Sequence, residues 1–322
     1  MLHRSIGVRV GWLAFLALGT TQTALIADDL GDRLAQLNVR ERTDHYVLAG
    51  TVPDKRLEAF GRALEFIHRE YSKGFSKLLS AERGKKSAAA RRAGGSEGES
   101  FAADTTRFRV IIFKQKSEYL DFGRAFITSG TEHTRGMYID AHQLLLILDQ
   151  GNHDETFGIL FHEAFHQFLA RYVPAAPTWL NEGLATYYGT GKVRGGRLRF
   201  SQPRRDYWKI VRKLMTRKQT IALHDVINAS HAQFYSRQSF PVSGFEDVRA
   251  KSVYYAEAYT LVHMMVNDRQ GRTLLQGYIR ALSKARGSEL RAINERFFSA
   301  KKLAQIEPGW VRYVRSNPEN RG

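Results

Sequence analysis

Residues 162–166 read HEAFH, in which two histidines flank a glutamate in the pattern H-E-x-x-H. On an α-helix, side chains four residues apart lie on one face, so the imidazoles of His162 and His166 can reach a single metal ion. Glu163 lies about 100° further round the helix, beside the metal rather than on it. A general base occupies such a position when it takes a proton from water that the metal activates. The segment therefore predicts a metal-dependent hydrolytic site.

The residues around this segment predict a buried helix. Asp154 is the expected N-cap, and Pro174 and Pro177 are expected to end the helix. Apolar side chains give it broad faces: Phe157, Leu160, Phe161, Ala164, Phe165, Phe168 and Leu169. Histidines and a glutamate are costly on a buried helix unless they have partners. Taken alone, the pentapeptide also fits a core helix with two hydrogen-bonded histidines.

A second short helix is expected from Thr178 to about Tyr188, where residues 179–185 read WLNEGLA. It carries Glu182, which follows His166 after 15 intervening residues (182 − 166 − 1). Two helices joined by a proline-containing turn can pack antiparallel and present Glu182 to the histidine pair. The result would be a His₂Glu metal site with an open fourth position.

The sequence H-E-x-x-H followed by W-L-N-E-G-x-A resembles the gluzincin zinc metallopeptidases, in particular the aminopeptidase and leukotriene A4 hydrolase family. It is also similar to secreted bacterial peptidase-like proteins that share H-E-x-x-H-Q and W-x-x-E-G-L-A. The resemblance implies a thermolysin-like catalytic fold and a Zn²⁺ ion bound by His162, His166 and Glu182. It further implies peptide hydrolysis with Glu163 as the general base.

The same resemblance suggests a donor for the oxyanion that forms during hydrolysis. Residues 253–261 read VYYAEAYTL and resemble the aminopeptidase segment V-P-Y-E-K-G-F-A-L, which places Tyr255 on the catalytic tyrosine. Tyr254 and Tyr259 lie within the same six residues and are rivals for this role. Which of the three hydroxyls faces the metal stays open at this point.

The chain also departs from the aminopeptidase pattern. Where those enzymes carry G-x-M-E-N, residues 136–140 read GMYID, so aminopeptidase specificity is in question and Asp140 is the nearest substitute for the missing glutamate. The spacing from the histidines to Glu182 is shorter than is usual in that family. One turn after Glu182 stands Thr186, whose hydroxyl rather than a carboxylate is available to orient a ligand histidine.

The predicted fold class is α+β, with a small mixed sheet in the N-terminal half packed on a mostly helical C-terminal half. Strands are expected at residues 46–52, 107–114, 136–140 and 144–148. Helices are expected at residues 54–79, 117–126, 207–215, 223–228, 252–267, 272–284 and 288–298, with a hairpin at 192–200. By the family resemblance, the strand near residues 136–139 is the edge strand that pairs with an extended peptide.

The predicted domains are a signal peptide at residues 1–27, an α/β subdomain at 28–152 and a helical subdomain at 153–322. A low-complexity stretch at 82–100 is expected to be a surface insertion. The apolar run from Val10 to Leu18 is too short for a comfortable membrane span. Cleavage near Ala24 or Ala27 would export the protein to the periplasm or the extracellular space, and an uncleaved anchor is the alternative.

The composition limits the chemistry. The chain has no cysteine, which excludes disulfides, thiolate metal sites and cysteine nucleophiles. Its formal net charge is +17, and eleven lysines and arginines between residues 190 and 218 face one acid, Asp206. Such a surface can attract acidic substrates, anionic cell-wall polymers or membranes, or it can be a solvated basic face. Nucleic acid is not the expected partner, because no recognised binding motif accompanies the charge.

The sequence therefore predicts an exported zinc-dependent hydrolase that acts on a peptide or protein substrate. Zinc suits a tetrahedral N₂O ligand set, although cobalt and manganese are not excluded by ligand type. Two alternatives remain. One is a catalytically silent zinc-containing protein attached through its basic surface to cell wall or membrane, and the other is a metal-free helical scaffold in which the histidines and Glu182 form a buried ion-pair network.

Overall fold

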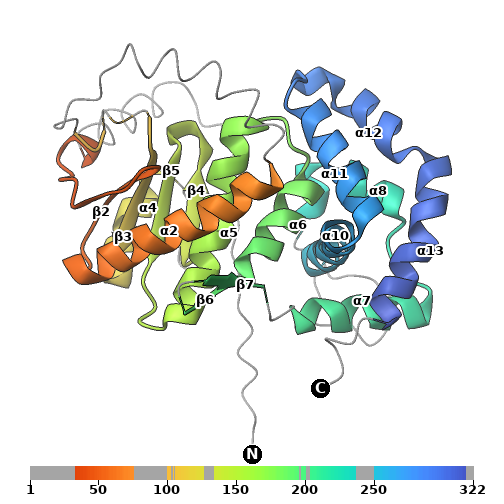
Figure 1. Ribbon diagram of the computed structural model, residues 1–322, viewed down its shortest axis with the longest axis horizontal. Helices are drawn as coiled ribbons and strands as arrows, with labels where there is room; N and C mark the ends of the chain where they lie inside the picture. Colours follow the sequence, from red (N-terminus) through yellow and green to blue (C-terminus); the bar gives the residue numbers. More distant parts are fainter. Residues whose placement is uncertain are drawn as a thin grey trace, which may run out of the picture. The chain divides into compact units, whose positions relative to one another are not determined.

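The computed structural model describes residues 33–75, 100–102, 104, 106–126, 134–195, 197–200, 204–236 and 250–316. The predicted signal peptide and residues 82–99 of the predicted insertion lie outside this part of the chain. The described residues combine a small mixed sheet with many helices, which confirms the predicted α+β class (Figure 1). Contacts divide the chain into two compact units, residues 1–65 with 93–167 and residues 66–92 with 168–322.

The first unit is built on a five-stranded sheet with the order β1-β2-β3-β5-β4. The strands are β1 (Glu41–Arg42), β2 (Tyr46–Gly50), β3 (Phe108–Phe113), β4 (Gly136–Ile139) and β5 (Leu144–Leu148). Strands β2, β3 and β5 run parallel, while β1 and β4 pair antiparallel at the two ends of the order. The sheet is therefore mixed, as predicted, and β4 is an edge strand of it.

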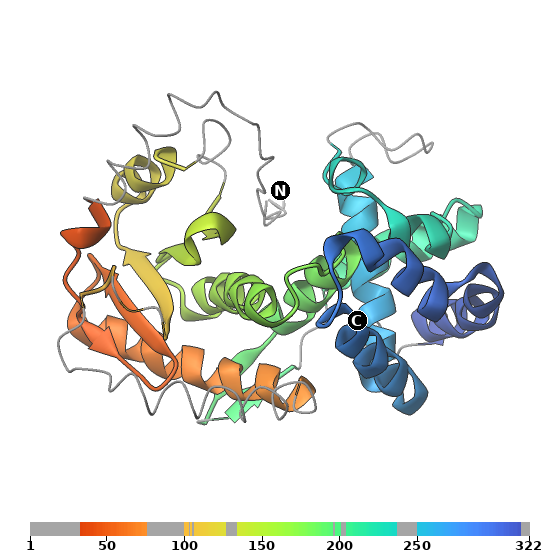
Figure 2. The same cartoon turned by 90° about the horizontal axis from the view of Figure 1, so that it is seen from above.

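Helices cover both faces of this sheet. On one face, the helix α4 (Lys116–Arg124) packs its Tyr119 and Phe122 against a core that includes Met137 of β4. On the other face, a Cβ at Gly136 of β4 would lie 2.6 Å from Ile159 of the helix α5 (His153–Tyr172). The strands lie between α4 and the helix α2 (Asp54–Gly74) when the unit is seen from above (Figure 2).

This double covering explains the burial of β3. Alternation along the strand puts Phe108, Val110 and Ile112 on one face of the sheet. The structure also buries Ile111 and Phe113, because strands with helices on both sides have two covered faces. All five residues of β5 are buried for the same reason.

The start of α5 is fixed by two polar contacts. The side chain of Asn152 accepts a hydrogen bond from the Asp154 backbone N–H at 3.0 Å, so Asn152 is the N-cap and the predicted cap, Asp154, is wrong. Just before it, Asp149 accepts hydrogen bonds of 2.6 and 2.7 Å from Arg56 of α2. Burial would raise the pKa of Asp149, but these hydrogen bonds outweigh it and lower the pKa. The carboxylate therefore stays charged and holds the loop that leads into α5.

The second unit is helical apart from one small hairpin. The hairpin strands are β6 (Lys192–Arg194) and β7 (Arg197–Arg199), within the predicted range. The helices are α6 (Thr178–Gly189), α7 (Arg205–Arg217), α8 (Leu223–Asn228), α9 (His231–Phe234), α10 (Ala250–Asn267), α11 (Arg269–Leu282), α12 (Leu290–Phe298) and α13 (Ala300–Ser316). Helices α9 and α13 were not predicted.

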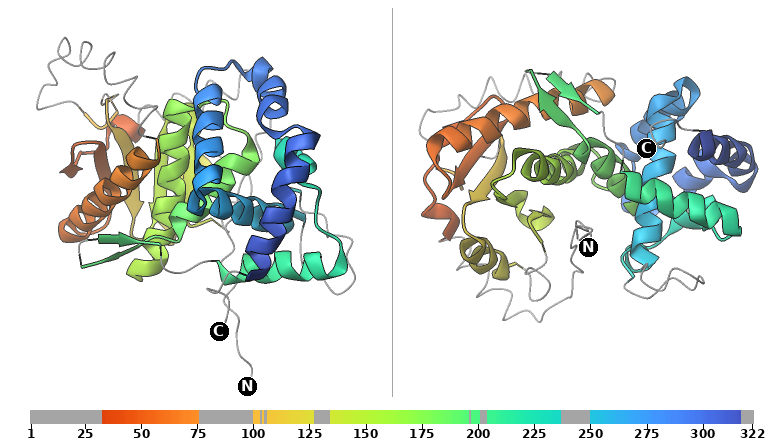
Figure 3. Two further views of the ribbon diagram at one scale, coloured as in Figure 1. Left: turned by 45° about the vertical axis from the view of Figure 1, so that its right-hand side comes forward. Right: turned by 90° about the horizontal axis from the view of Figure 1, so that it is seen from below.

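Helix α10 is the centre of this unit. It contacts α6, α7, α11, α13, α8 and α9, and the views in Figure 3 show it among them. A Cβ at Gly183 of α6 would lie 2.6 Å from the Val262 side chain and 2.9 Å from the Ala258 carbonyl oxygen of α10. The two helices therefore approach more closely than a larger residue at position 183 would allow. None of the described helices has both the length and the apolar character that a membrane span requires.

One buried carboxyl group in α10 makes stability depend on pH. Glu257 is fully buried, one of its oxygens accepts the Ile221 N–H at 3.0 Å, and the other has no hydrogen-bond partner in the described part of the chain. Burial raises its pKa well above 4.5, the Ile221 hydrogen bond opposes the shift, and the charge of Glu307 adds to it. The folded state thus holds this proton more tightly than the unfolded state does.

We expect Glu257→Gln to be more stable than the wild type at pH 8, by about 1–3 kcal/mol, the usual range for a buried polar group without its partner. Because its pKa is raised in the folded state, protonated Glu257 stabilises the wild type fully below about pH 4.5. This stabilisation is lost as pH rises toward the raised pKa. Urea unfolding at pH 5 and pH 8 measures the difference. The same substitution at the exposed Glu295 is the control, and an equal pH dependence for wild type and Glu257→Gln would refute the prediction.

Candidate metal centre

Helix α5 presents two imidazoles on one face. His162 and His166 stand one helical turn apart, and their ring centroids are 4.8 Å from each other with the planes at 81°. Both side chains are buried, with 8% and 4% of their surface exposed. The predicted pairing of the two histidines on a buried helix is therefore present.

Helix α6 carries the third group. Its N-cap is Pro177, in an extended conformation, so the proline that was expected to end α5 stands directly before α6. Glu182 lies in the first half of the helix and has 1% of its surface exposed. The next residue is Gly183, whose close approach to α10 sets this part of α6 against that helix.

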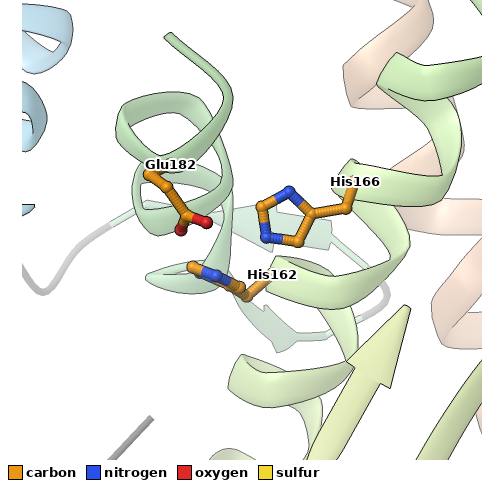
Figure 4. A group of neighbouring side chains, drawn as sticks. All are labelled: His162, His166 and Glu182. Atoms are coloured by element: carbon orange, nitrogen blue, oxygen red, sulfur yellow. The ribbon is translucent and has the colours of Figure 1, made fainter. Parts of the chain in front are cut away.

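The three predicted ligands come together. His162, His166 and Glu182 each offer one ligand atom, and these atoms all lie within 4.8 Å of one another. Figure 4 shows the carboxylate of Glu182 directed toward the two imidazole rings. The side chains form a buried group that can hold a metal ion. Among the described residues, no other set of three or more such side chains has this arrangement.

Glu163, the predicted base, is next to this group but not part of it. It is 1% exposed, and its Cγ would lie 3.0 Å from a Cβ at Gly136 of β4. Burial raises the pKa of Tyr119 on α4, and the charge of Glu163 adds to that increase. Glu163 of α5 therefore lies against Gly136 of the edge strand β4, and its charge reaches Tyr119 of α4.

The three rival tyrosines of α10 have separate surroundings. Tyr259 accepts a hydrogen bond from the Arg204 backbone N–H at 3.2 Å, and Tyr254 is partly exposed with its ring against Phe234. Tyr255 is buried. Its pKa is raised well above 10.0, first by burial and then by the charge of Glu182, and a hydrogen bond to Glu182 contributes to the same increase. The pKa of Tyr255 therefore responds to Glu182, whereas that of Tyr254 is raised by burial and by the charges of Asp225 and Glu257.

Two neighbours of Glu182 were not found from the sequence. Tyr235 donates a short hydrogen bond to the Oε1 atom of Glu182. Burial lowers the pKa of His231, and the charge of Glu182 opposes that shift. His231 belongs to α9 and Tyr235 is its C-cap, in a stretch where no helix was predicted. Tyr235 and Glu182 are 53 residues apart, and no motif links them.

Asp140 and Thr186, which were named from the sequence, and a third helical histidine, His263, lie in other settings. Asp140 is exposed and accepts a hydrogen bond from Tyr138 at 3.1 Å. Thr186 is buried on α6. His263 on α10 contacts the Tyr313 hydroxyl at 2.9 Å through Nδ1, which is the arrangement of a structural histidine. Comparison of the chain with models of protein families and with curated protein sequences finds no match.

Proposed function

We propose that the protein is an exported, zinc-dependent hydrolase of the gluzincin type that cleaves peptide bonds. The observation that carries the proposal is the buried convergence of His162, His166 and Glu182. The proposal of export comes from the sequence, because residues 1–27 lie outside the described part of the chain. The other supporting features are Glu163 and Tyr255, which are considered in turn.

The donor set fits a divalent metal ion. Two imidazole nitrogens and one carboxylate oxygen form the usual protein half of a catalytic zinc site, which leaves one coordination position for water or substrate. Burial of Glu182 as an anion would be unfavourable without a positive partner nearby, and a cation between the three groups supplies one. Nitrogen and oxygen donors in this number favour zinc over calcium or magnesium, which prefer all-oxygen sites.

Glu163 is placed to move protons. Bound zinc would lower the pKa of a water molecule toward neutrality and polarise the substrate carbonyl. Glu163 follows His162 directly and is buried on the same helix. In the proposed reaction it accepts a proton from the attacking water and passes it to the leaving amine. A metal site with a purely structural role has no need of this carboxylate, so its presence favours hydrolysis over a silent binding protein.

Tyr255 is the proposed oxyanion donor. A useful donor must be protonated and must have a hydrogen to give at the moment when negative charge forms on the substrate. The raised pKa keeps the Tyr255 hydroxyl protonated, and the hydroxyl is buried near the carboxylate of Glu182. Tyr259 accepts a hydrogen bond from the backbone N–H of Arg204, the N-cap of α7, so its hydroxyl oxygen is held at the start of that helix.

The edge strand β4 is the proposed docking place for the substrate backbone. It ends the strand order of the sheet, and Gly136 brings its backbone next to Glu163 without a side chain between them. An extended peptide can add to such an edge by backbone hydrogen bonds. We therefore also propose that the catalytic fold is thermolysin-like. Because Asp140 is exposed, we do not assign it the amine-binding role of the aminopeptidases.

Metal content and peptide cleavage together test the proposal. We expect the purified protein to contain about one zinc per chain and to cleave peptides. A chelator should remove both properties, and added zinc should restore both. Peptides with free and blocked N-termini separate exopeptidase from endopeptidase activity. A protein that takes up no metal after incubation with Zn²⁺, or that cleaves peptides equally well with and without chelator, would contradict the proposal.

A further inference from the structure

Glu182 has a hydrogen-bond donor that the proposed reaction does not use. The Tyr235 hydroxyl donates to its Oε1 atom. Tyr235 is the C-cap of α9, a helix of four residues. A tyrosine donating to a buried carboxylate is a charge-assisted hydrogen bond, which is stronger than a bond between neutral groups. The contact therefore restrains the rotation of the Glu182 carboxylate.

The short helix α9 holds Tyr235 in place by three contacts. Ser230 and Gln233 form a reciprocal capping box at the start of the helix. Phe234 is fully buried, and its ring centroid lies 5.2 Å from that of Tyr255. The ring of Tyr235 itself lies 4.3 Å from the ring of His231, centroid to centroid. The donor is thus positioned by its own element rather than by Glu182 alone.

The two tyrosines near Glu182 differ in what their hydroxyls do. Tyr235 donates a hydrogen bond to the Oε1 atom of the carboxylate, whereas burial first and then the charge of Glu182 raise the pKa of Tyr255. Their ring centroids are 6.1 Å apart. The Tyr235 hydroxyl therefore holds a proposed metal ligand, and the Tyr255 hydroxyl stays protonated for the proposed contact with a substrate.

We propose that Tyr235 is a positioning residue that orients Glu182 for metal binding and thereby sets the affinity of the site. The inference rests on the proposed function, because it takes Glu182 to be a metal ligand. With Oε1 held by the hydroxyl, the carboxylate meets the cation in one orientation and loses little conformational freedom on binding. Hydrogen-bonding partners of ligand side chains commonly contribute about 10–100-fold to metal affinity.

The test compares Tyr235→Phe with Tyr254→Phe in the full-length protein. Both substitutions remove one hydroxyl and keep the ring, and both rings lie against Phe234. Burial raises the pKa of Tyr254, and the charges of Asp225 and Glu257 add to that increase, so its hydroxyl lies near other carboxylates than Glu182. We expect Tyr235→Phe to weaken Zn²⁺ binding by about 10–100-fold in a competition titration with a chelator. Tyr254→Phe should bind Zn²⁺ as the wild type does.

The visible absorption of the Co²⁺-substituted protein gives a second readout that a merely structural role would not change. Removal of the Tyr235 hydroxyl should shift or weaken these bands, because the orientation of a ligand carboxylate changes. Tyr255→Phe should retain the wild-type zinc affinity while lowering kcat for peptides, which separates the two tyrosines. Thermal unfolding of the metal-free variants shows how much of any change arises from the fold.

The outcomes separate this inference from the proposed function. If the wild type binds zinc tightly and Tyr235→Phe binds it equally well with unchanged Co²⁺ bands, the positioning role is overturned and the proposed hydrolase stands. The same holds if Tyr235→Phe lowers only the thermal stability of the metal-free protein. If the wild type itself binds no metal, both proposals are overturned.

Discussion

Replacement of Glu163 by glutamine should abolish peptide hydrolysis while leaving zinc bound. Glutamine keeps the size of the side chain, so the packing of this buried residue beside Gly136 is preserved. What is lost is the ability to accept a proton from water, because the amide is not a base at neutral pH. A positioned general base contributes about 10²–10⁴-fold to a rate, and kcat should fall by that factor. Steady-state kinetics with peptides and metal analysis of the same sample give the two values.

Glu155→Gln is the matched control for this prediction. It is the same chemical change on the same helix, at a residue whose carboxylate pairs with Arg135 at 2.6 Å near the start of α5. Its kcat should stay close to that of the wild type. Turnover by Glu163→Gln at the wild-type rate would remove Glu163 as the base. A loss of zinc in that variant would instead show that Glu163 helps to bind the metal.

Substitution of His166 by alanine should remove the metal. Three protein ligands leave no spare donor, and the ligand atoms of His162 and Glu182 alone make a two-coordinate site. Loss of a direct ligand should weaken zinc binding by more than the 100-fold or so that follows from losing an indirect partner. Metal analysis of the purified variant beside the wild type measures this, and peptide cleavage should disappear with the zinc.

His263→Ala provides the control for a histidine outside the candidate site. His263 is partly buried, contacts Tyr313 and the ring of Trp208, and has its pKa lowered to about 4 by burial, so it is neutral at pH 7. The variant is expected to lose stability but to keep one zinc per chain. Equal zinc content in His166→Ala and the wild type would place the metal elsewhere. An absence of zinc from all three proteins would mean that His162 and His166 are core histidines.

Much of the fold followed from local patterns. The apolar periodicity and flanking prolines located α5 and α6, and the strong helical pattern at 252–267 located α10. The short elements had no such signal. Strand β1 has two residues and α9 has four, which is too little for a period to show. Helix α13 contains Pro308 and was not predicted, because proline usually interrupts a helix.

The candidate site divides in the same way. His162, Glu163 and His166 lie within five residues, so helical geometry alone places them. The position of Glu182 depended on a prediction of how two helices pack, and the three side chains do come together. The contact from Tyr235 depends on the position of a four-residue helix relative to Glu182, which lies 53 residues earlier in the chain. No local propensity encodes such a contact. Tyr255 was named by resemblance to a family segment, and its nearness to Glu182 depends on a neighbour distant in sequence.

The convergence of His162, His166 and Glu182 has a consequence for the stability of the protein. A chain without cysteine has no covalent cross-link, but a zinc ion held by α5 and α6 would join residues 162, 166 and 182 in the folded state alone. By mass action, free zinc at 1,000 times its dissociation constant adds about 4 kcal/mol to the free energy of unfolding. The unfolding temperature would then be a property of the zinc concentration around the protein as well as of its sequence.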